Sequence, residues 1–207
     1  MGTFYTPEEL KELGIKEFGE NVKISRNAML YHPEKLVLGH DVRIDDFTVI
    51  SGNVRLHNYV HLSQFCGLYG DEAGIEIEDY TAVAAKCSIY AVSDDYVGPS
   101  VPTPMVPMKY KTTMIKEPVH IGKYSILGVN TVVLPGVTIG EGTTVGAMSL
   151  CNKDLDTWSV YAGIPARRLK DRDKKVADLV KEFESERGET ESYHGRPYAL
   201  QIVCRLI

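Results

Sequence analysis

Aliphatic residues recur at every sixth position over much of this 207-residue chain. One series starts at Leu38, slips by three residues after Leu68 and resumes at Ile77, and a further series starts at Ile121. All 14 positions of these series are aliphatic: Leu38, Ile44, Ile50, Leu56, Leu62, Leu68, Ile77, Val83, Ile89, Ile121, Leu127, Val133, Ile139 and Val145. A period of six is neither helical nor a simple strand alternation. It predicts a parallel β-helix built from stacked coils.

A second series of residues supports this interpretation. The residue four places after each aliphatic one is small or β-branched at 13 of the 14 positions, and the exception, Glu72, lies at the slip. Positions four and six of each hexad are two residues apart, so both side chains point inward across a short strand. Glycine often follows the aliphatic residue, and we expect glycine or small polar residues at the turns, where φ is unusual. Three hexads form one triangular coil, so 14 hexads predict four to five stacked coils.

The two ends of the chain do not follow the repeat. Thr6, Pro7 and Glu9 form the start signal of a short helix over residues 6–13, which we expect to close one end of the β-helix. We therefore divide the chain into a helical cap (1–20), a β-helix domain (21–170) and a C-terminal helix with a tail (171–207). The C-terminal helix is amphipathic, with an apolar face formed by Val176, Leu179, Val180 and Phe183. The final nine residues, ALQIVCRLI, predict an added strand or helix.

A long loop interrupts the repeat at residues 96–118. It contains five prolines, which keep a chain extended and stiff, and an excursion of this length from a compact repeat is more often functional than idle. We expect this loop to reach over a neighbouring subunit and to help form the wall of an acceptor site. Its apolar and aromatic side chains, and one in the last coil, offer surface for a sugar ring: Tyr96, Met105, Met108, Tyr110 and Trp158.

Composition excludes several classes of protein. A formal net charge of −5 argues against broad binding to nucleic acid or to anionic lipid. No apolar run approaches the roughly 20 residues that a membrane span needs, and the N-terminus does not resemble a signal peptide. Four cysteines without a CxxC pair suit a reducing cytoplasm rather than a disulfide framework or a zinc site. Cys66 and Cys87 occupy inward small-residue positions, so we interpret them as core side chains.

Two segments resemble the hexapeptide-repeat acyltransferases. They are IGKYSILGVNTVVLPGVTIGEGTTVGAMSL and the closing VYAGIPARRLKDR, and the resemblance covers about residues 20–170. SDDYVG and SVPTPMVP match the pattern of the members that act in surface-polysaccharide synthesis, which are similar to galactoside-type sugar O-acetyltransferases. The resemblance implies an all-β, left-handed parallel β-helix with a short N-terminal helix and a C-terminal α-helix. It also implies a homotrimer with sites in the clefts between neighbours, and acetyl-CoA as co-substrate.

The same resemblance implies a CoA site at the C-terminal coils. Gly146 and Ala147 allow the backbone to approach the pantetheine arm, and Pro165–Ala166 match the position beside the adenine. Cations for the nucleotide phosphates are available nearby: Lys153, Arg167, Arg168 and Lys170.

Acyl transfer needs a base, and histidine suits this role near neutral pH. Related sugar O-acetyltransferases carry a histidine where this chain has Asp94, so the base must be another residue. Of the six histidines, His57, His61 and His120 remain as candidates. His61 and His120 each precede an inward aliphatic residue, so both point outward. Our hypothesis is that His61 is the base and that Asp94 or Asp95 of a neighbouring chain orients its imidazole.

The sequence leaves the acceptor open. The primary prediction is acetyl-CoA-dependent O-acetylation of a saccharide or surface-polysaccharide precursor. The alternative is N-acetylation of a nucleotide-linked amino sugar. Two other functions fit less well: a metalloenzyme like the γ-class carbonic anhydrases, for which the histidine spacing is unsuitable, and a non-catalytic scaffold. We predict no metal site.

Overall fold

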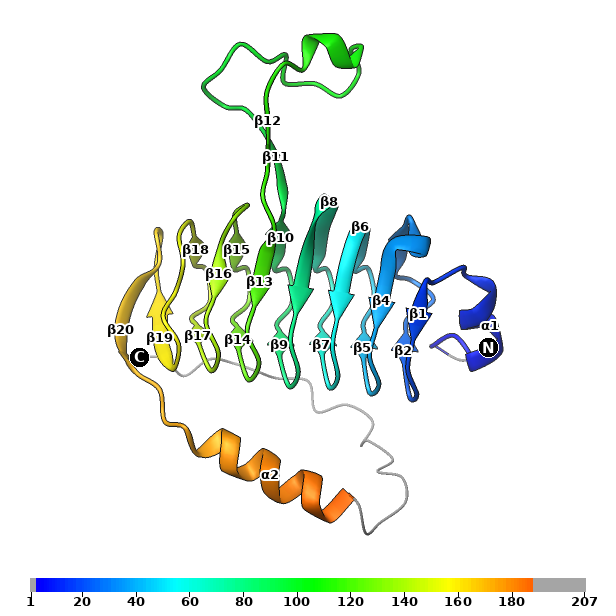
Figure 1. Ribbon diagram of the computed structural model, residues 1–207, viewed down its shortest axis with the longest axis vertical. Coiled ribbons are helices and arrows are strands. Elements are labelled where there is room, and N and C mark those ends of the chain that lie inside the picture. The colour runs from blue at the N-terminus through cyan, green and yellow to red at the C-terminus, as the bar shows by residue number, and fades with distance from the viewer. Residues whose placement is uncertain (1–2, 188–207) are drawn as a thin grey trace.

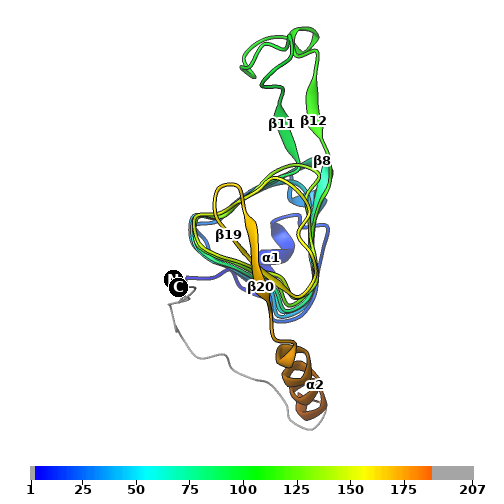
Figure 2. The ribbon, with the colours of Figure 1, turned by 90° about the vertical axis from the view of Figure 1, so that its left-hand side faces the viewer.

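A computed structural model describes residues 3–187, which form a parallel β-solenoid of about seven turns (Figure 1). Seen along its axis, the solenoid is a triangular prism with three faces (Figure 2). The strand or helix predicted for residues 199–207 lies outside the described residues.

Each face is a ladder of short parallel strands. The first face stacks β2 (Lys23–Ile24), β5 (Arg43–Ile44), β7 (His61–Leu62), β9 (Ala82–Val83), β14 (Ile126–Leu127), β17 (Thr144–Val145) and β19 (Ser159–Ala162). The second face holds β3 (Met29–Tyr31), β10 (Ser88–Tyr90), β15 (Val132–Val133), β18 (Leu150–Cys151) and the first parts of β6 (Val49–Leu56) and β8 (Gly67–Ile77). The third face holds β1 (Glu17–Phe18), β4 (Leu36–Leu38), β13 (Val119–Ile121), β16 (Thr138–Ile139) and the second parts of β6 and β8. A short 3₁₀ helix, Pro33–Lys35, precedes β4.

The hexad pattern correctly predicts the core. All 14 aliphatic positions are buried, and together they form one continuous hydrophobic cluster along the prism axis. Burying such a side chain contributes about 1.5–3 kcal/mol, and stacking makes this burial possible. The number of coils was underestimated, because β1, β2 and β3 come from a segment with irregular repeats and β19 closes a last coil beyond the final hexad.

The three cysteines within residues 3–187 behave as core side chains. Cys66, Cys87 and Cys151 are buried and free. Burial raises the pKa of the Cys66 thiol to about 11, and it raises the pKa of Cys87 and of Cys151 to about 12. These thiols are therefore protonated at neutral pH and poor nucleophiles.

The expectation of glycine or a small polar residue at the turns holds at some corners, such as Gly142 and Asn130, but not at others. Left-handed backbone conformations occur at the corners on ordinary residues, among them Asp41, Tyr59, Tyr80, Tyr124 and Trp158 on one corner and Phe47, Phe65, Lys86, Asn130 and Met148 on the next. Gly128, which follows an aliphatic position, is absent from the positive-φ residues. A Cβ there would lie 2.5 Å from the backbone nitrogen of Ala147 on the neighbouring coil. Close approach between coils, rather than an unusual φ, explains the glycine.

Helices lie at the end and along the side of the prism. α1 (Pro7–Glu12) has the predicted capping box between Thr6 and Glu9, and it buries Leu10 in the core at the N-terminal end of the prism (Figures 1 and 2). α2 (Lys175–Arg187) runs along one corner (Figure 1). No helix among residues 3–187 is both long and apolar enough to cross a membrane.

α2 contacts the corner through its last two turns. The ring of Phe183 packs edge-on against Tyr59 with 5.6 Å between centroids. Glu184 accepts a hydrogen bond from the Tyr80 hydroxyl at 2.8 Å, and Arg187 binds Asp41 at 3.0 Å. The predicted apolar face is therefore only partly covered within one chain, because Leu179 keeps 53% of its surface exposed.

A β-hairpin projects from the prism where the repeat is interrupted (Figures 1 and 2). Its neck is the antiparallel pair β11 (Val92–Asp94) and β12 (Met114–Lys116), and a 3₁₀ helix, Met108–Tyr110, lies in its outer part. Ser93 lies four places after Ile89, a position that the hexad pattern assigns to the core. It is instead half-buried within β11, because the chain has already left the coil at this point.

Candidate active site

His61 is hydrogen-bonded to a carboxylate of its own chain. On β7 its side chain points outward, and its Nε2 lies 2.9 Å from Oδ2 of Asp45 on the preceding coil. The Asp45 side chain is only 5% exposed and also accepts a hydrogen bond from Arg43 Nε at 2.7 Å. Burial alone raises the pKa of Asp45, but the hydrogen bonds from His61 and Arg43 outweigh it and hold this pKa below its usual value. A charged, buried carboxylate therefore fixes the orientation of the imidazole.

Asp45 is the residue that sequence reasoning missed. The hypothesis gave the orienting role to Asp94 or Asp95, whereas within one chain Asp45 binds His61. The available signal was register, because a coil of 18 residues places Arg43 directly beside His61. Asp45 lies two residues further along, on the same outward side as Arg43.

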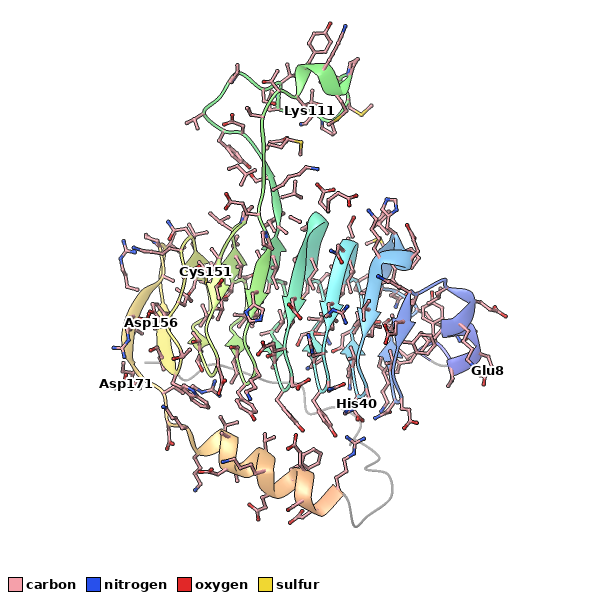
Figure 3. All side chains as sticks on the ribbon, viewed as in Figure 1. Glu8, His40, Lys111, Cys151, Asp156 and Asp171 are labelled. Atoms are coloured by element: carbon pink, nitrogen blue, oxygen red, sulfur yellow. The ribbon has the colours of Figure 1, made fainter. Side chains whose placement is uncertain are left out.

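Asp94 and Asp95 lie in the hairpin. Asp94 is in β11, and its Oδ1 binds Lys111 Nζ at 2.5 Å (Lys111 is labelled in Figure 3). The Asp95 carboxylate accepts hydrogen bonds from the Thr113 hydroxyl and from two backbone N–H groups of the same loop. These hydrogen bonds, that of Thr113 first, hold the pKa of Asp95 below its usual value. The Asp95 carboxylate thus has three hydrogen-bond partners, which stabilise the loop, whereas the Asp94 carboxylate binds Lys111 alone among the described residues.

Within one chain the hairpin and His61 are far from contact. The hairpin leaves the prism on the side opposite the turns that surround β7 (Figure 1). The chain does not itself bring His61 together with either hairpin aspartate.

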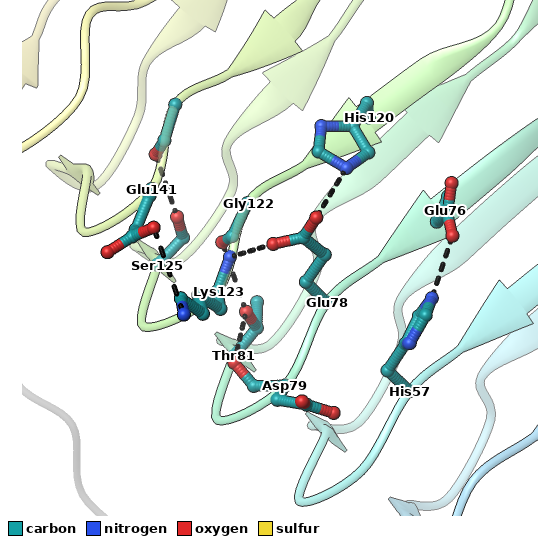
Figure 4. A network of polar contacts seen from close by, with 11 residues as sticks. His57, Glu76, Glu78, Asp79, Thr81, His120, Gly122, Lys123, Ser125 and Glu141 are labelled. Carbon is teal, nitrogen blue, oxygen red and sulfur yellow. Dashed lines mark hydrogen bonds and ion pairs between the residues drawn. The ribbon is translucent and has the colours of Figure 1, made fainter. Parts of the chain in front are cut away.

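The two other candidate histidines also carry carboxylate partners (Figure 4). His57 Nε2 lies 2.7 Å from Glu76, and His120 Nε2 lies 3.0 Å from Glu78. Glu78 additionally accepts the backbone N–H of Lys123 at 2.9 Å. His120 belongs to β13, where the chain returns to the prism after the hairpin. A carboxylate partner therefore does not by itself single out His61.

The residues predicted to bind CoA gather at the C-terminal end of the prism. β19 pairs antiparallel with β20 (Arg167–Asp171), and the turn between them contains Pro165 and the buried Ala166. Ala166 donates its N–H to Leu150 at 2.8 Å, which fixes this turn against the preceding coil. The Arg168 guanidinium binds Ser159 Oγ at 3.1 Å and Asp171.

The remaining cations at this end are available to a ligand. Lys153, Arg167 and Lys170 are exposed and form no ion pair with another residue of the described range. Arg168 is thus held by the protein, while these three can bind phosphate.

One corner of the prism joins the predicted CoA end to the His61–Asp45 pair. One residue from each successive coil forms a row along this corner: Asp45, Ser63, Ala84, Gly128 and Gly146. Backbone hydrogen bonds between adjacent coils hold the row in register. The N–H of Asp45, for example, donates to the carbonyl of Leu62, which directly precedes Ser63. At about 4.8 Å per coil, the four steps from Asp45 to Gly146 span roughly 19 Å. Gly146 is buried and Ala147 beside it is exposed.

The described residues form a cavity away from these side chains. A cavity of about 140 Å³ lies against α2, where His40, Tyr59, Glu184 and Arg187 are among its lining residues. None of the predicted site residues lines it. Among residues 3–187, no group of three or more His, Cys, Asp or Glu side chains is arranged to hold a metal ion.

Comparison with known proteins identifies the family. Residues 113–153 match the family model "Bacterial transferase hexapeptide (six repeats)". The dTDP-4-amino-4,6-dideoxy-D-glucose acyltransferase of Escherichia coli is 38% identical over 178 residues, which cover 84% of this chain and 92% of that protein. WbbJ of Escherichia coli K12, whose assigned role is O-acetyl transfer in lipopolysaccharide biosynthesis, is 30% identical over 71% of this chain and 74% of its own.

Solved structures support the same family. AntD, an N-acyltransferase from Bacillus cereus, has been solved in complex with dTDP and 3-hydroxybutyryl-CoA. It superimposes with a TM-score of 0.87 at 39% identity, over 90% of this chain and 98% of AntD. The fold, the repeat and these likenesses over most of the chain together place it among the hexapeptide-repeat acyltransferases.

Proposed function

We propose that this enzyme transfers an acyl group from a CoA thioester to the 4-amino group of dTDP-4-amino-4,6-dideoxyglucose or a close analogue. The observation that carries this proposal is the identity of 38% to an acyltransferase for that sugar nucleotide over 84% of the chain. The structural likeness to AntD over 90% of the chain supports it further. N-acylation, the alternative in the sequence analysis, thereby replaces O-acetylation as the primary function.

The reaction needs a proton acceptor. The sugar nitrogen attacks the thioester carbonyl, a C–N bond forms, the C–S bond breaks, and a proton passes from nitrogen to the departing sulfur. We assign the proton transfer to His61, because buried Asp45 holds its Nε2 and leaves Nδ1 for the substrate. Asp94 is our candidate for holding the amine, since its carboxylate binds only Lys111 among residues 3–187 and is partly exposed.

Two chains are required for this arrangement. His61 and Asp94 lie on separate parts of one chain, and the hairpin extends well beyond its own prism (Figures 1 and 2). We therefore propose a homotrimer in which the hairpin of one chain brings Asp94 to the His61 corner of the next. Asp95, with three hydrogen bonds of its own, stabilises that hairpin.

Acetyl-CoA or a longer acyl-CoA enters from the C-terminal end of the prism. Gly146 and Ala147 leave room for the pantetheine arm, the turn at Pro165–Ala166 lies beside the adenine, and Lys153 and Arg167 bind phosphate. The row from Gly146 back to Asp45 provides a track for the thioester toward His61.

A direct assay tests the function. The purified protein is incubated with acetyl-CoA and dTDP-4-amino-4,6-dideoxyglucose, and thiol release and the mass of the sugar nucleotide are followed. We expect one acetyl group per nucleotide, resistant to hydroxylamine because an amide, unlike an ester, survives it. Acetylation of dTDP-glucose, which has no amine, or a hydroxylamine-labile product would favour the O-acetyl transfer assigned to WbbJ. Absence of transfer to either acceptor would refute the proposal.

A further inference from the structure

A second row of side chains follows the same corner, two residues beyond the row of Asp45. It consists of Phe47, Phe65, Lys86, Asn130 and Met148, one from each successive coil. All five have left-handed backbone conformations and exposed side chains. We call this row the phenylalanine corner. The left-handed conformation directs each side chain outward, away from the core and toward solvent.

The two rings at its N-terminal end form a flat platform. Phe47 and Phe65 stack with centroids 5.0 Å apart and 18° between their planes. They remain 48% and 54% exposed, so no described part of the chain covers them. A left-handed backbone is disfavoured for a bulky residue by about 1–2 kcal/mol. Two adjacent phenylalanines nevertheless adopt it and present a ring face to solvent. A planar heterocycle is the type of ligand that such a platform binds.

Polar groups adjoin the platform. Lys86 follows Phe65 by one coil, is exposed, and forms no ion pair or side-chain hydrogen bond with another residue between 3 and 187. The Gln64 amide, beside Phe65, likewise has no partner in that part of the chain. The carboxylate next to Phe47, that of Asp46, is already bound by Ser25 and Asn27. The platform therefore has a free cation and a free amide close by.

We propose that the phenylalanine corner binds the nucleoside diphosphate half of the acceptor. The thymine ring stacks on Phe47 and Phe65, the Gln64 amide meets the polar edge of the base, and the ammonium of Lys86 binds the diphosphate. This inference rests on the proposed function, whose acceptor is a dTDP sugar, and it assigns the part of the prism that recognises the nucleotide.

This placement is compatible with the chemistry. The platform row and the row of Asp45 are two residues apart, which is at most about 7 Å of chain. A sugar joined to phosphates at Lys86 therefore stays within reach of Ser63 and Ala84, between the His61–Asp45 pair and Gly146. The base does not occupy the track of the thioester, because the two lie on different rows of the corner.

Direct binding of dTDP and of thymidine tests this subsite. Titration calorimetry on the intact protein is expected to show that Phe65→Ala weakens both ligands by about tenfold or more, because a base–aromatic stack is lost. Phe65→Leu, which keeps an apolar side chain of similar volume, should have the same effect and guards against misfolding of the alanine variant. Lys86→Gln should weaken dTDP several-fold and leave thymidine unchanged, since thymidine has no phosphate.

Two matched variants serve as controls. Tyr31→Ala removes an exposed aromatic residue outside the corner, and Lys181→Gln removes an exposed lysine of α2. Neither should change dTDP binding. The KM for acetyl-CoA should be unchanged in the Phe65 and Lys86 variants, and the KM for the dTDP amino sugar should rise in parallel with the Kd of dTDP.

The outcomes separate this inference from the proposed function. If the wild-type enzyme acylates the dTDP amino sugar while Phe65→Ala and Lys86→Gln retain its KM, the subsite is wrong and the function stands. If Phe65→Ala dissociates the oligomer in light scattering, the platform is a contact with a second copy of the chain, and the subsite is again wrong. If the wild type neither binds dTDP nor acylates its amino sugar, both proposals fail.

Discussion

Two corners of the prism carry stacked aromatic rings, but the rings are covered on one corner and exposed on the other. The tyrosine corner stacks the rings of Tyr59, Tyr80 and Tyr124 on successive coils, and Trp158 follows beyond Gly142. The phenylalanine corner likewise stacks Phe47 on Phe65. Both sets adopt the left-handed conformation, each at its own corner of the coil. The tyrosine corner lies under α2, whereas the phenylalanine corner is bare.

The difference shows that a stack of aromatic rings at a corner can serve either stability or ligand binding. On the tyrosine corner, burial and the hydrogen bond to Glu184 raise the pKa of Tyr80. Its hydroxyl is thus a hydrogen-bond donor that holds α2, and the aromatic rings contribute to stability. On the phenylalanine corner the rings lie beside His61, Asp45 and the track to Gly146, so their exposed faces are available to a ligand. The comparison predicts losses of activity at one corner and losses of stability at the other.

The largest effect is expected at the histidine beside the bare corner. His61→Ala should lower kcat by at least about a hundredfold, because the proton on the attacking nitrogen loses its acceptor. His57→Ala is the matched control, since His57 also binds a carboxylate but directly follows β6, at the end of the third face. Steady-state kinetics with the dTDP amino sugar measure both. A decrease of only two- or threefold for His61→Ala would exclude it as the base.

Truncating one ring on each corner tests the comparison directly. Tyr59 contacts Tyr80, Phe183 and Arg187, so Tyr59→Ala should lower the free energy of unfolding by about 2 kcal/mol. Phe65→Ala should lower it by clearly less, because half of that ring already faces solvent. Chemical denaturation of the two variants under one condition provides the measurement. Equal losses of stability would mean that both corners are structural.

At the C-terminal end of the prism, two adjacent arginines should differ in their effect on the KM for acetyl-CoA. Arg167→Gln is expected to raise the KM for acetyl-CoA about tenfold, since a hydrogen bond between charged groups contributes about 1.5–3 kcal/mol. Arg168→Gln should change this KM less, because its guanidinium is engaged by Ser159 and Asp171. The opposite order in initial-rate measurements would reassign the phosphate contact to Arg168.

The smallest effect concerns the pH dependence of stability at Asp45. Its pKa is depressed in the folded protein, so its stabilising contribution is complete above the unfolded value near 3.9. The contribution disappears as the pH falls through the lower folded pKa. Asp45→Asn removes the titrating group, so the stability of the variant should fall less steeply than that of the wild type below about pH 4. Parallel slopes in acid denaturation would show that Asp45 does not contribute in this way.

The repeat was predictable because it is a local pattern. A side chain that points inward at one coil does so at every coil, which is why Leu38 and Val145 could be assigned to the core without knowing their neighbours. The capping box at Thr6 and Glu9 was predictable for the same reason, since three residues define it. The segment around β2 and β3 was assigned to the β-helix without regular hexads, and β1 lies in the stretch assigned to the helical cap, because the six-residue spacing is irregular before Leu38.

The outward side chains were harder to predict. The assignment of His61 to the outside was correct, but its partner was not found, since Asp45 is adjacent only through the register between two coils. The departure of the chain at Val92, before the prolines begin, likewise depended on pairing between β11 and β12.

The sequence by itself determined the prism: its inward stripe and its helical cap follow from spacing along the chain. Only the tertiary structure decided which outward groups meet, which corner α2 covers, and which aromatic rings stay exposed. The physical reason is that hydrophobic burial depends on the period of the chain, whereas an ion pair or a stacked ring depends on how far one coil is displaced against the next.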